Sequence, residues 1–335
     1  MVKDNPQKVL TSAEMGKLWA VYAANTMAKC ILTYFLNHVK DDQIKKVLDD
    51  ALILTNSILE SVLLFFEESN FPVPVGFTDK DVNLNAPRLF QDDFYLYYLS
   101  YVGKAGMSIY HVAIPMMTRK DIRSFFIDTL TKTANLMAKV NDALEAKGLL
   151  RNSPEIPTPD DIDFIDSQSY LTGFFGNKRT LHGLEIGHLF ANINNDETSK
   201  ALLVAFSQVA KDPKVKKYFV RGKNLNQRHI SAATEKLNHD NLPAPGLLEH
   251  LVTDSTEPPF SDRMMLFHKI DMFSMKIRTY ANGASLNGRR DVGAMYAKFL
   301  LDVSLYVEDG VNIMIDNNWM EQPPQAADRE NLSSD

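Results

Sequence analysis

Several histidine and carboxylate side chains in the second half of the chain are of the types that bind transition metals. Glu185-Ile186-Gly187-His188 places a carboxylate and an imidazole three residues apart, on one face of a helix. His229, His268, Asp271 and Glu308 follow further along the chain. A two-metal centre in a four-helix bundle uses a Glu from each of two helices and a Glu-x-x-His from each of the other two. Iron or manganese held in this way would support oxidase, peroxide-consuming or storage chemistry.

The heights of these residues along their predicted helices argue against one shared metal site. Counted from the turn between the first two helices of this half, His188, His229 and His268 lie about 24, 17 and 7 residues away, which is about 25 Å of spread at about 1.5 Å per residue. A metal ion needs its ligand atoms within about 2.0–2.2 Å. Glu185 and His188 also lie in a first helical turn, where capping is the commoner role.

A tighter group consists of His268 and Asp271 on one predicted helix and Glu308 on the next. These three residues lie within about three positions of one level, and Arg221 or Lys223 of another helix falls at the same height. The opposite charges favour a structural cluster of salt bridges and hydrogen bonds over a metal site. The sequence therefore predicts no catalytic residue and no resident cofactor. All six residues, Glu185 and His188 included, stay open as metal ligands for Fe or Mn.

An internal duplication determines the elements that must position these residues. A shift of 171 positions places Leu10, Glu14 and Gly16 on Leu181, Glu185 and Gly187, and a shift of 170 positions places Val82, Phe90 and Tyr110 on Val252, Phe260 and Tyr280. The first copy has Ile58 and Tyr98 at the positions of His229 and His268. Metal chemistry is therefore expected, if anywhere, in the second copy alone.

Hydrophobic periodicity predicts four long helices in each copy. Their predicted ranges are 11–39, 41–70, 91–114 and 119–147 in the first copy, and 181–211, 213–241, 261–286 and 289–317 in the second. The first two helices and the last two are joined by very short turns, so each pair is antiparallel. About 19 residues join the pairs and could extend about 60 Å, which is enough to return along a helix of about 42 Å. This all-α topology, two tandem four-helix bundles with long crossovers, is that of the ferritin-like class.

The repeat also predicts the division of the chain. We expect a first bundle at 10–149, a Pro- and acid-rich linker at 150–179, a second bundle at 180–319 and an extended tail at 320–335. Aromatic residues in the linker predict that it docks on the bundles: Phe164, Tyr170, Phe174 and Phe175. Residues on the apolar stripes are predicted to be buried: Trp19, Leu32, Phe35, Leu130, Met137, Leu203, Phe206, Leu300 and Val307.

Composition excludes several classes of protein. The formal net charge of −6 argues against a general binder of nucleic acid or anionic membranes. Cys30 is the only cysteine, so the chain forms no internal disulfide. No apolar run reaches the roughly 20 residues that a membrane span requires. The aromatic run at 94–98 favours core packing together with an interface, to a protein partner or to a second copy. These features predict a soluble cytoplasmic protein.

Several segments resemble a family of spore-forming Bacillus-type bacteria. The resemblance covers almost the whole chain and rests on segments 82–90, 252–256, 306–310 and 319–326. It implies two tandem ferritin-like bundles and location in the spore, since some members are labelled spore coat proteins by similarity. No assigned activity carries over, although His188, His229 and His268 match histidines of the family pattern. We therefore expect a non-enzymatic structural or interaction protein, with a metal-binding ferritin-like protein as the alternative.

Overall fold

The computed structural model describes residues 9–176, 178–286 and 288–332. Within these residues all regular structure is helical, and the eight long helices fall where the periodicity predicts them. The first bundle comprises α1 (Ser12–His38), α2 (Asp42–Glu68), α3 (Asp92–Ala113) and α4 (Lys120–Ala146). The second bundle comprises α5 (Gly183–Val209), α6 (Pro213–His239), α7 (Asp262–Ser285) and α8 (Arg290–Asp316).

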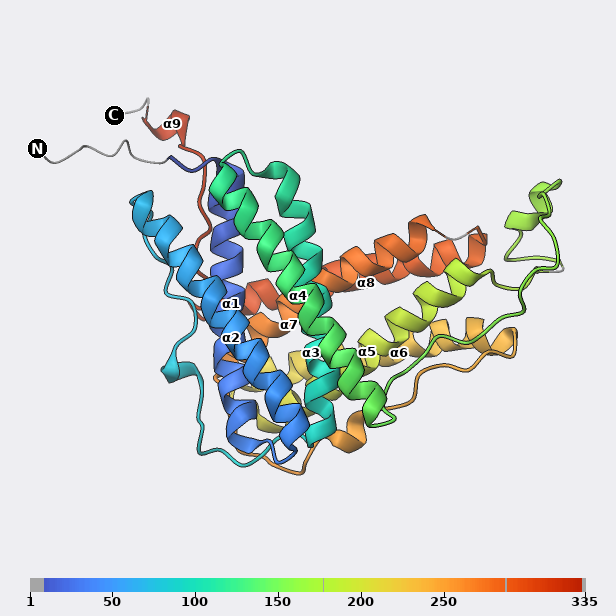
Figure 1. Cartoon of the computed structure of the whole chain (residues 1–335), viewed down its shortest axis with the longest axis horizontal. Helices are drawn as coiled ribbons and strands as arrows, with labels where there is room; N and C mark the ends of the chain where they lie inside the picture. Colours follow the sequence, from blue (N-terminus) through green and yellow to red (C-terminus); the bar gives the residue numbers. More distant parts are fainter. Residues whose placement is uncertain (1–8, 177, 287, 333–335) are drawn as a thin grey trace, which may run out of the picture.

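Each bundle consists of two helical hairpins joined by a long crossover. In Figure 1 the segment after α2 runs back along the first bundle before α3 begins, and the segment after α6 does the same in the second bundle. Short 3₁₀ helices interrupt these crossovers at η1 (Asp79–Asp81) and η4 (Glu249–Leu251). The predicted topology of two tandem bundles with long crossovers is confirmed. The bundles cross at a steep angle and meet chiefly through α3, α5 and α7.

The helix ends follow from local chemistry. Thr11 Oγ1 accepts a hydrogen bond from the Glu14 amide at 3.3 Å, and the Glu14 carboxylate accepts one from the Thr11 amide at 2.9 Å. This capping box satisfies amides that the first turn leaves without partners. Gly148 follows α4 with φ +64, a left-handed conformation that favours glycine. The boundaries therefore arise from the residues that the sequence places there.

The two crossovers pair with each other. Isolated antiparallel bridges join Val82 to Phe260 and Phe90 to Val252. Because Val252 and Phe260 are the counterparts of Val82 and Phe90, the pairing is reciprocal, as across a twofold axis. Another pair of counterparts, Tyr98 and His268, stacks with ring centroids 5.7 Å apart. The two halves are therefore related by a local twofold axis near these rings.

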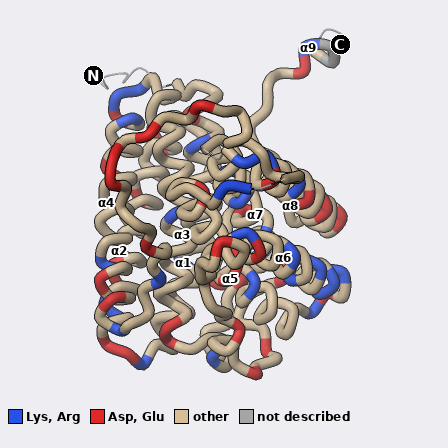
Figure 2. Tube along the Cα trace, turned by 90° about the vertical axis from the view of Figure 1, so that its right-hand side faces the viewer, with Lys and Arg blue, Asp and Glu red and all other residues tan. Residues whose placement is uncertain are grey.

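Opposite charges line the outer faces of two helices in the second bundle. Figure 2 shows the basic residues of α6 beside the acidic residues of α8. Arg221 lies 2.7 Å from Asp309, and Lys214 lies 3.8 Å from Asp316. Both pairs are on the surface, where such contacts contribute little to stability.

Four of the nine residues predicted to form the core are buried, and the other five are half-buried. Leu32, Phe35, Leu203 and Phe206 are buried. The other predicted core residues are half-buried: Trp19, Leu130, Met137, Leu300 and Val307.

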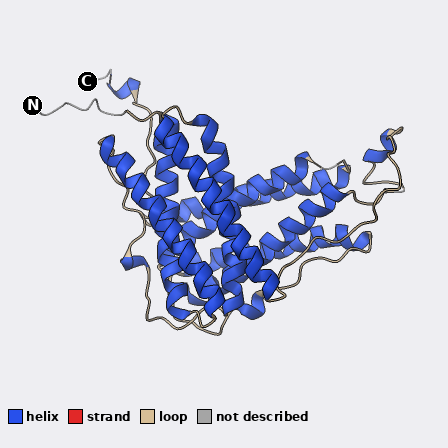
Figure 3. Ribbon diagram, viewed as in Figure 1, coloured by secondary structure: helices blue, strands red, loops and turns tan. Residues whose placement is uncertain are grey.

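The middle of the linker, up to η3 (Gln168–Leu171), projects beyond the bundles, as Figures 1 and 3 show. Its ends contact the second bundle, where Arg151 donates to Asn194 of α5 and Gly173 is buried beside Asp291 of α8. The linker phenylalanines at 164, 174 and 175 are exposed, so the prediction that they dock is wrong. Only Tyr170 of the four is half-buried, with the Arg179 guanidinium 4.1 Å from its ring centroid. In the projecting part, the Ile162 and Phe164 amides donate to the side chains of the aspartates just before them.

Candidate functional site: a buried ion network in the second bundle

Polar side chains from all four helices meet at the centre of the second bundle. Asp196 comes from α5, Asn226 and His229 from α6, Lys276 from α7 and Asp302 from α8. A two-metal carboxylate centre draws on the four helices in the same way. Asn226 and His229 have the spacing of its Glu-x-x-His pair. On α7, however, a lysine projects inward where a carboxylate would be needed.

The Lys276 ammonium lies at the middle of this group. Its Nζ atom donates to Asn226 Oδ1 at 2.6 Å and lies 2.8 Å from Asp196 Oδ1. The second carboxylate oxygen of Asp196 accepts a hydrogen bond from the Tyr280 hydroxyl at 2.7 Å. These four side chains are buried, so the ion pair is shielded from water and from salt. Burial lowers the pKa of Lys276, and the neighbouring Asp196 carboxylate opposes that shift.

His229 extends the network towards α8. Its Nδ1 atom is 3.2 Å from the Tyr280 hydroxyl, and its Nε2 atom is 3.3 Å from Asp302 Oδ2. The ring also stacks on Phe299 with centroids 3.9 Å apart. Burial lowers the pKa of His229, and Asp196 opposes the shift. Packing and hydrogen bonding therefore hold this imidazole in place without a metal ion.

Two further buried lysines surround the central pair. Lys269 donates to Ser199 Oγ at 2.8 Å and lies 5.2 Å from the centroid of the Phe273 ring. Lys200 lies 3.0 Å from Glu197 and 2.9 Å from Glu249 of the crossover. Charged groups in an interior are tolerated when they are paired and hydrogen-bonded. These contacts therefore fasten α7 and the crossover to α5.

The donor set does not fit a two-metal centre. In the described parts of the chain, no three His, Cys, Asp or Glu side chains are placed to share a metal ion. Asp196 and His229 are near each other, but the Lys276 ammonium occupies the space beside the carboxylate. A fixed positive charge at that point repels a second cation. We therefore derive no metal chemistry from this site.

Glu185 serves as a structural carboxylate at the end of the second bundle. It accepts hydrogen bonds from Arg179 at 2.7 and 2.8 Å and from the Gly288 and Arg289 amides at 2.9 Å each. Burial raises the pKa of Glu185, but these hydrogen bonds outweigh burial and lower the pKa to about 2. Glu14 of the first copy holds the start of α4 in the same way, through the Arg119 amide at 2.8 Å. His188 lies half-buried on the following turn, apart from the ion network.

The predicted cluster of His268, Asp271 and Glu308 facing Arg221 or Lys223 is wrong. His268 Nε2 lies 3.1 Å from the Tyr98 hydroxyl, at the junction of the two bundles. Asp271 lines a cavity in the first bundle. Glu308 is exposed, and its neighbour Asp309 pairs with Arg221. Residues at one level along the bundle lie at the same height, but their side chains can point in different directions around their helices.

The sequence-based reasoning missed the residues that form the centre of the network: Asp196, Asn226, Lys269 and Lys276. A comparison of the two copies could have found them, because the first copy has Asn25, Thr55, Leu99 and Gly106 at the matching positions. The two lysines replace leucine and glycine on the inner face of a predicted helix, and a charged residue at such a position signals a buried pairing.

Comparison with protein families identifies the chain. A family profile described as "Protein of unknown function (DUF3231)" matches residues 2–162 and again residues 169–332. The chain belongs to this family. The two matches are the two copies of the repeat, and together they span nearly all of the sequence.

Two solved structures resemble the chain weakly. One is described as a "putative spore coat protein" from Bacillus halodurans, with 14% identity, a TM-score of 0.42, and coverage of 45% of this chain and 98% of that one. The other is a two-domain protein from Anabaena variabilis with DJ-1/ThiJ/PfpI-like and ferritin-like domains, with 14% identity and a TM-score of 0.35. The match covers 58% of this chain and 53% of the Anabaena protein. The search of curated proteins gave no match. No helix in the described ranges has the length and apolar character to cross a bilayer.

Proposed function

We propose that this DUF3231 protein is a non-enzymatic interaction protein that binds another polypeptide chain through its linker. The observation that supports this proposal is the exposure of the linker phenylalanines, 86% for Phe164 and 87% for Phe175. The partner is a second copy of the chain or a different protein. Spore association forms part of the same proposal and rests on the sequence resemblance.

The linker has the composition of a binding surface. Apolar side chains are exposed along it: Ile156, Ile162, Phe164, Ile165, Phe174 and Phe175. Water-exposed apolar groups in such number mark interaction sites, because a partner that covers them removes their surface from water. Aromatic residues are also frequent anchors of protein interfaces. The projection of this segment beyond the bundles leaves it accessible to a partner (Figure 1).

Site-specific photo-cross-linking in a sporulating Bacillus-type host tests the proposal. A photoreactive phenylalanine analogue is placed at position 164 or 175, and the control places it at Leu301, an apolar residue on α8 that is 61% exposed. We expect discrete cross-linked products from the linker positions alone. A product of twice the chain mass of 37.9 kDa indicates self-association, and another mass indicates a different protein. Equal labelling at all three positions would contradict a linker interface.

We also propose that the second bundle holds no resident metal, because the Lys276–Asp196 ion pair occupies its centre. The fixed ammonium beside the carboxylate supports this proposal. The test is elemental analysis of protein purified without a histidine tag. We expect iron and manganese at background. Near-stoichiometric metal that is lost in His229→Ala would favour the metal-binding alternative instead.

A further inference from the structure

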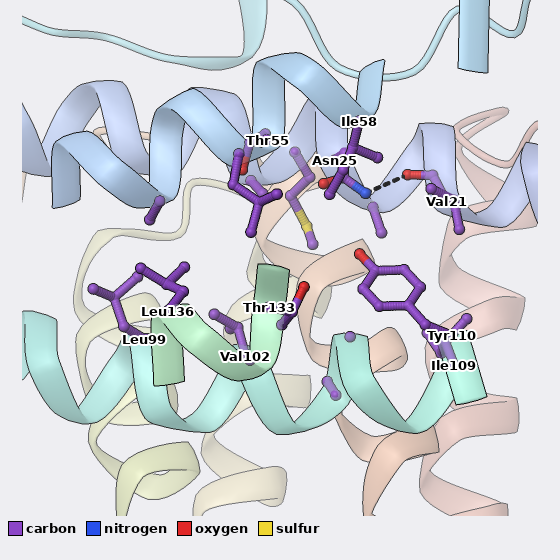
Figure 4. A pocket seen from close by; sticks show the side chains of 18 of the residues that line it. Val21, Asn25, Thr55, Ile58, Leu99, Val102, Ile109, Tyr110, Thr133 and Leu136 are labelled. Carbon is purple, nitrogen blue, oxygen red and sulfur yellow. Dashed lines mark hydrogen bonds between the residues drawn. The ribbon is translucent and has the colours of Figure 1, made fainter. Parts of the chain in front are cut away.

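The first bundle contains a cavity where the second bundle has its ion network. The cavity measures about 130 Å³, and all four helices contribute to its wall. Figure 4 shows the side chains of Val21, Ile58, Leu99 and Leu136 around this space, with the Tyr110 hydroxyl directed towards Asn25. The wall is mainly apolar, with a few hydroxyl and amide groups.

Comparison of the copies explains the cavity. Lys276, whose side chain fills the centre of the second bundle, corresponds to Gly106, and Lys269 corresponds to Leu99. Replacement of a lysine by glycine removes the side chain that would occupy the space. Tyr110 keeps the position of Tyr280, so the surrounding framework is retained. The cavity is therefore the space that the ion network fills in the other copy.

A carboxylate also lines this space, and it comes from the second bundle. Asp271 of α7 lies on the cavity wall. Its counterpart in the first copy is Tyr101, whose ring contacts Lys269 across the junction of the two bundles. Within the described ranges the Asp271 carboxylate forms no hydrogen bond and no close ion pair. Burial raises the pKa of Asp271, and the Arg278 guanidinium opposes that shift. Arg278 itself donates to Ser108 Oγ at 3.0 Å.

The Asp271 side chain is half-buried, and a carboxylate in a mainly apolar wall is stabilised by a cation or a hydrogen-bond donor. The cavity volume of about 130 Å³ is near the roughly 150 Å³ of an engineered apolar cavity that binds benzene. We propose that the first bundle binds a small molecule with an apolar body the size of one six-membered ring and a primary ammonium group, which pairs with Asp271. This site is separate from the linker interface.

Three probes of nearly equal size test the proposal on the full chain: benzylamine, toluene and benzoate. Binding is measured by ligand-observed NMR and titration calorimetry. We expect benzylamine to bind about 10- to 100-fold more tightly than toluene, the usual value of a charge-assisted hydrogen bond. Benzoate should not bind, because its carboxylate would face Asp271. Equal binding of benzylamine and toluene, or no binding of either at millimolar concentration, would overturn the proposal.

Variants test the contribution of the Asp271 charge and that of the cavity volume separately. Asp271→Asn should abolish the preference for benzylamine and leave toluene binding intact, whereas Asp309→Asn removes a surface charge and should change neither. Ala28→Leu, which fills the cavity from α1, should abolish binding of both probes. Thermal melting checks that each variant is folded, and Val102→Phe replaces Ala28→Leu if that variant is not. Benzylamine binding that survives both Asp271→Asn and a folded cavity-filling variant would refute the site.

Discussion

The Lys276→Met substitution gives the sharpest test of the buried network. Methionine fills nearly the same space as lysine but lacks the ammonium group. The Asp196 carboxylate, buried in the second bundle, would keep the Tyr280 hydroxyl at 2.7 Å and lose the positive charge at 2.8 Å. Asn226 Oδ1 would lose its donor at 2.6 Å. An uncompensated charge would remain in the interior.

The expected loss is about 3–5 kcal/mol in the free energy of unfolding, the usual cost of removing one partner of a buried ion pair. The double variant Asp196→Asn/Lys276→Met should be less destabilised than the sum of its single variants, because no isolated charge remains. The difference between the double variant and that sum measures the coupling between the two side chains.

Urea unfolding followed by far-ultraviolet circular dichroism provides the measurement. The matched control is Lys214→Met, the same change at a lysine whose side chain is 71% exposed and 3.8 Å from Asp316. This control should lose no more than about 1 kcal/mol. If Lys276→Met were as stable as Lys214→Met, or if the double variant were simply additive, the account of the network as a coupled buried pair would be refuted.

Two other predictions concern packing and acid stability. Phe206→Ala should cost about 3–5 kcal/mol in urea unfolding, because its ring packs against Phe219 and Phe260; Leu301→Ala is the exposed control, and equal stability of the two would contradict the packing. Glu185, with a pKa of about 2 against an ordinary value of 4.5, stabilises the folded state above about pH 4.5 and loses this contribution as the pH falls towards 2. In Glu185→Gln the melting temperature should be lower than wild type at pH 6 and should fall less on acidification, and a parallel pH profile would show that Glu185 is not the group responsible.

The helices could be predicted because their signals are local. Thr11 and Glu14 start α1 through contacts within one turn, and each observed boundary lies within two residues of the predicted one. The crossovers followed from loop length alone, since a helix of known rise fixes the distance that the next segment must cover. Phe206 was identified as core because the apolar stripe of a long helix must face its neighbours.

The site could not be predicted in the same way, because it depends on the direction in which each side chain points and on contacts between the two copies. His268 and Asp271 share one face of α7, and that face meets the first bundle, where His268 contacts Tyr98 and Asp271 lines the cavity. The buried lysines were missed because lysine is normally a surface residue. The linker phenylalanines were expected to dock because aromatic side chains are usually buried. Only the folded arrangement shows that they remain exposed.

The reciprocal pairing of the crossovers has an evolutionary consequence. When two identical subunits meet across a twofold axis, every substitution appears on both sides at once, so each copy must suit both roles. Joining the copies in one chain removes that restriction, and each side of the Tyr98–His268 junction can change by itself. The second copy has buried lysines where the first copy has a cavity, within one architecture. Covalent linkage therefore allows the two halves to differ in their centres while the backbone bridges between their crossovers remain reciprocal.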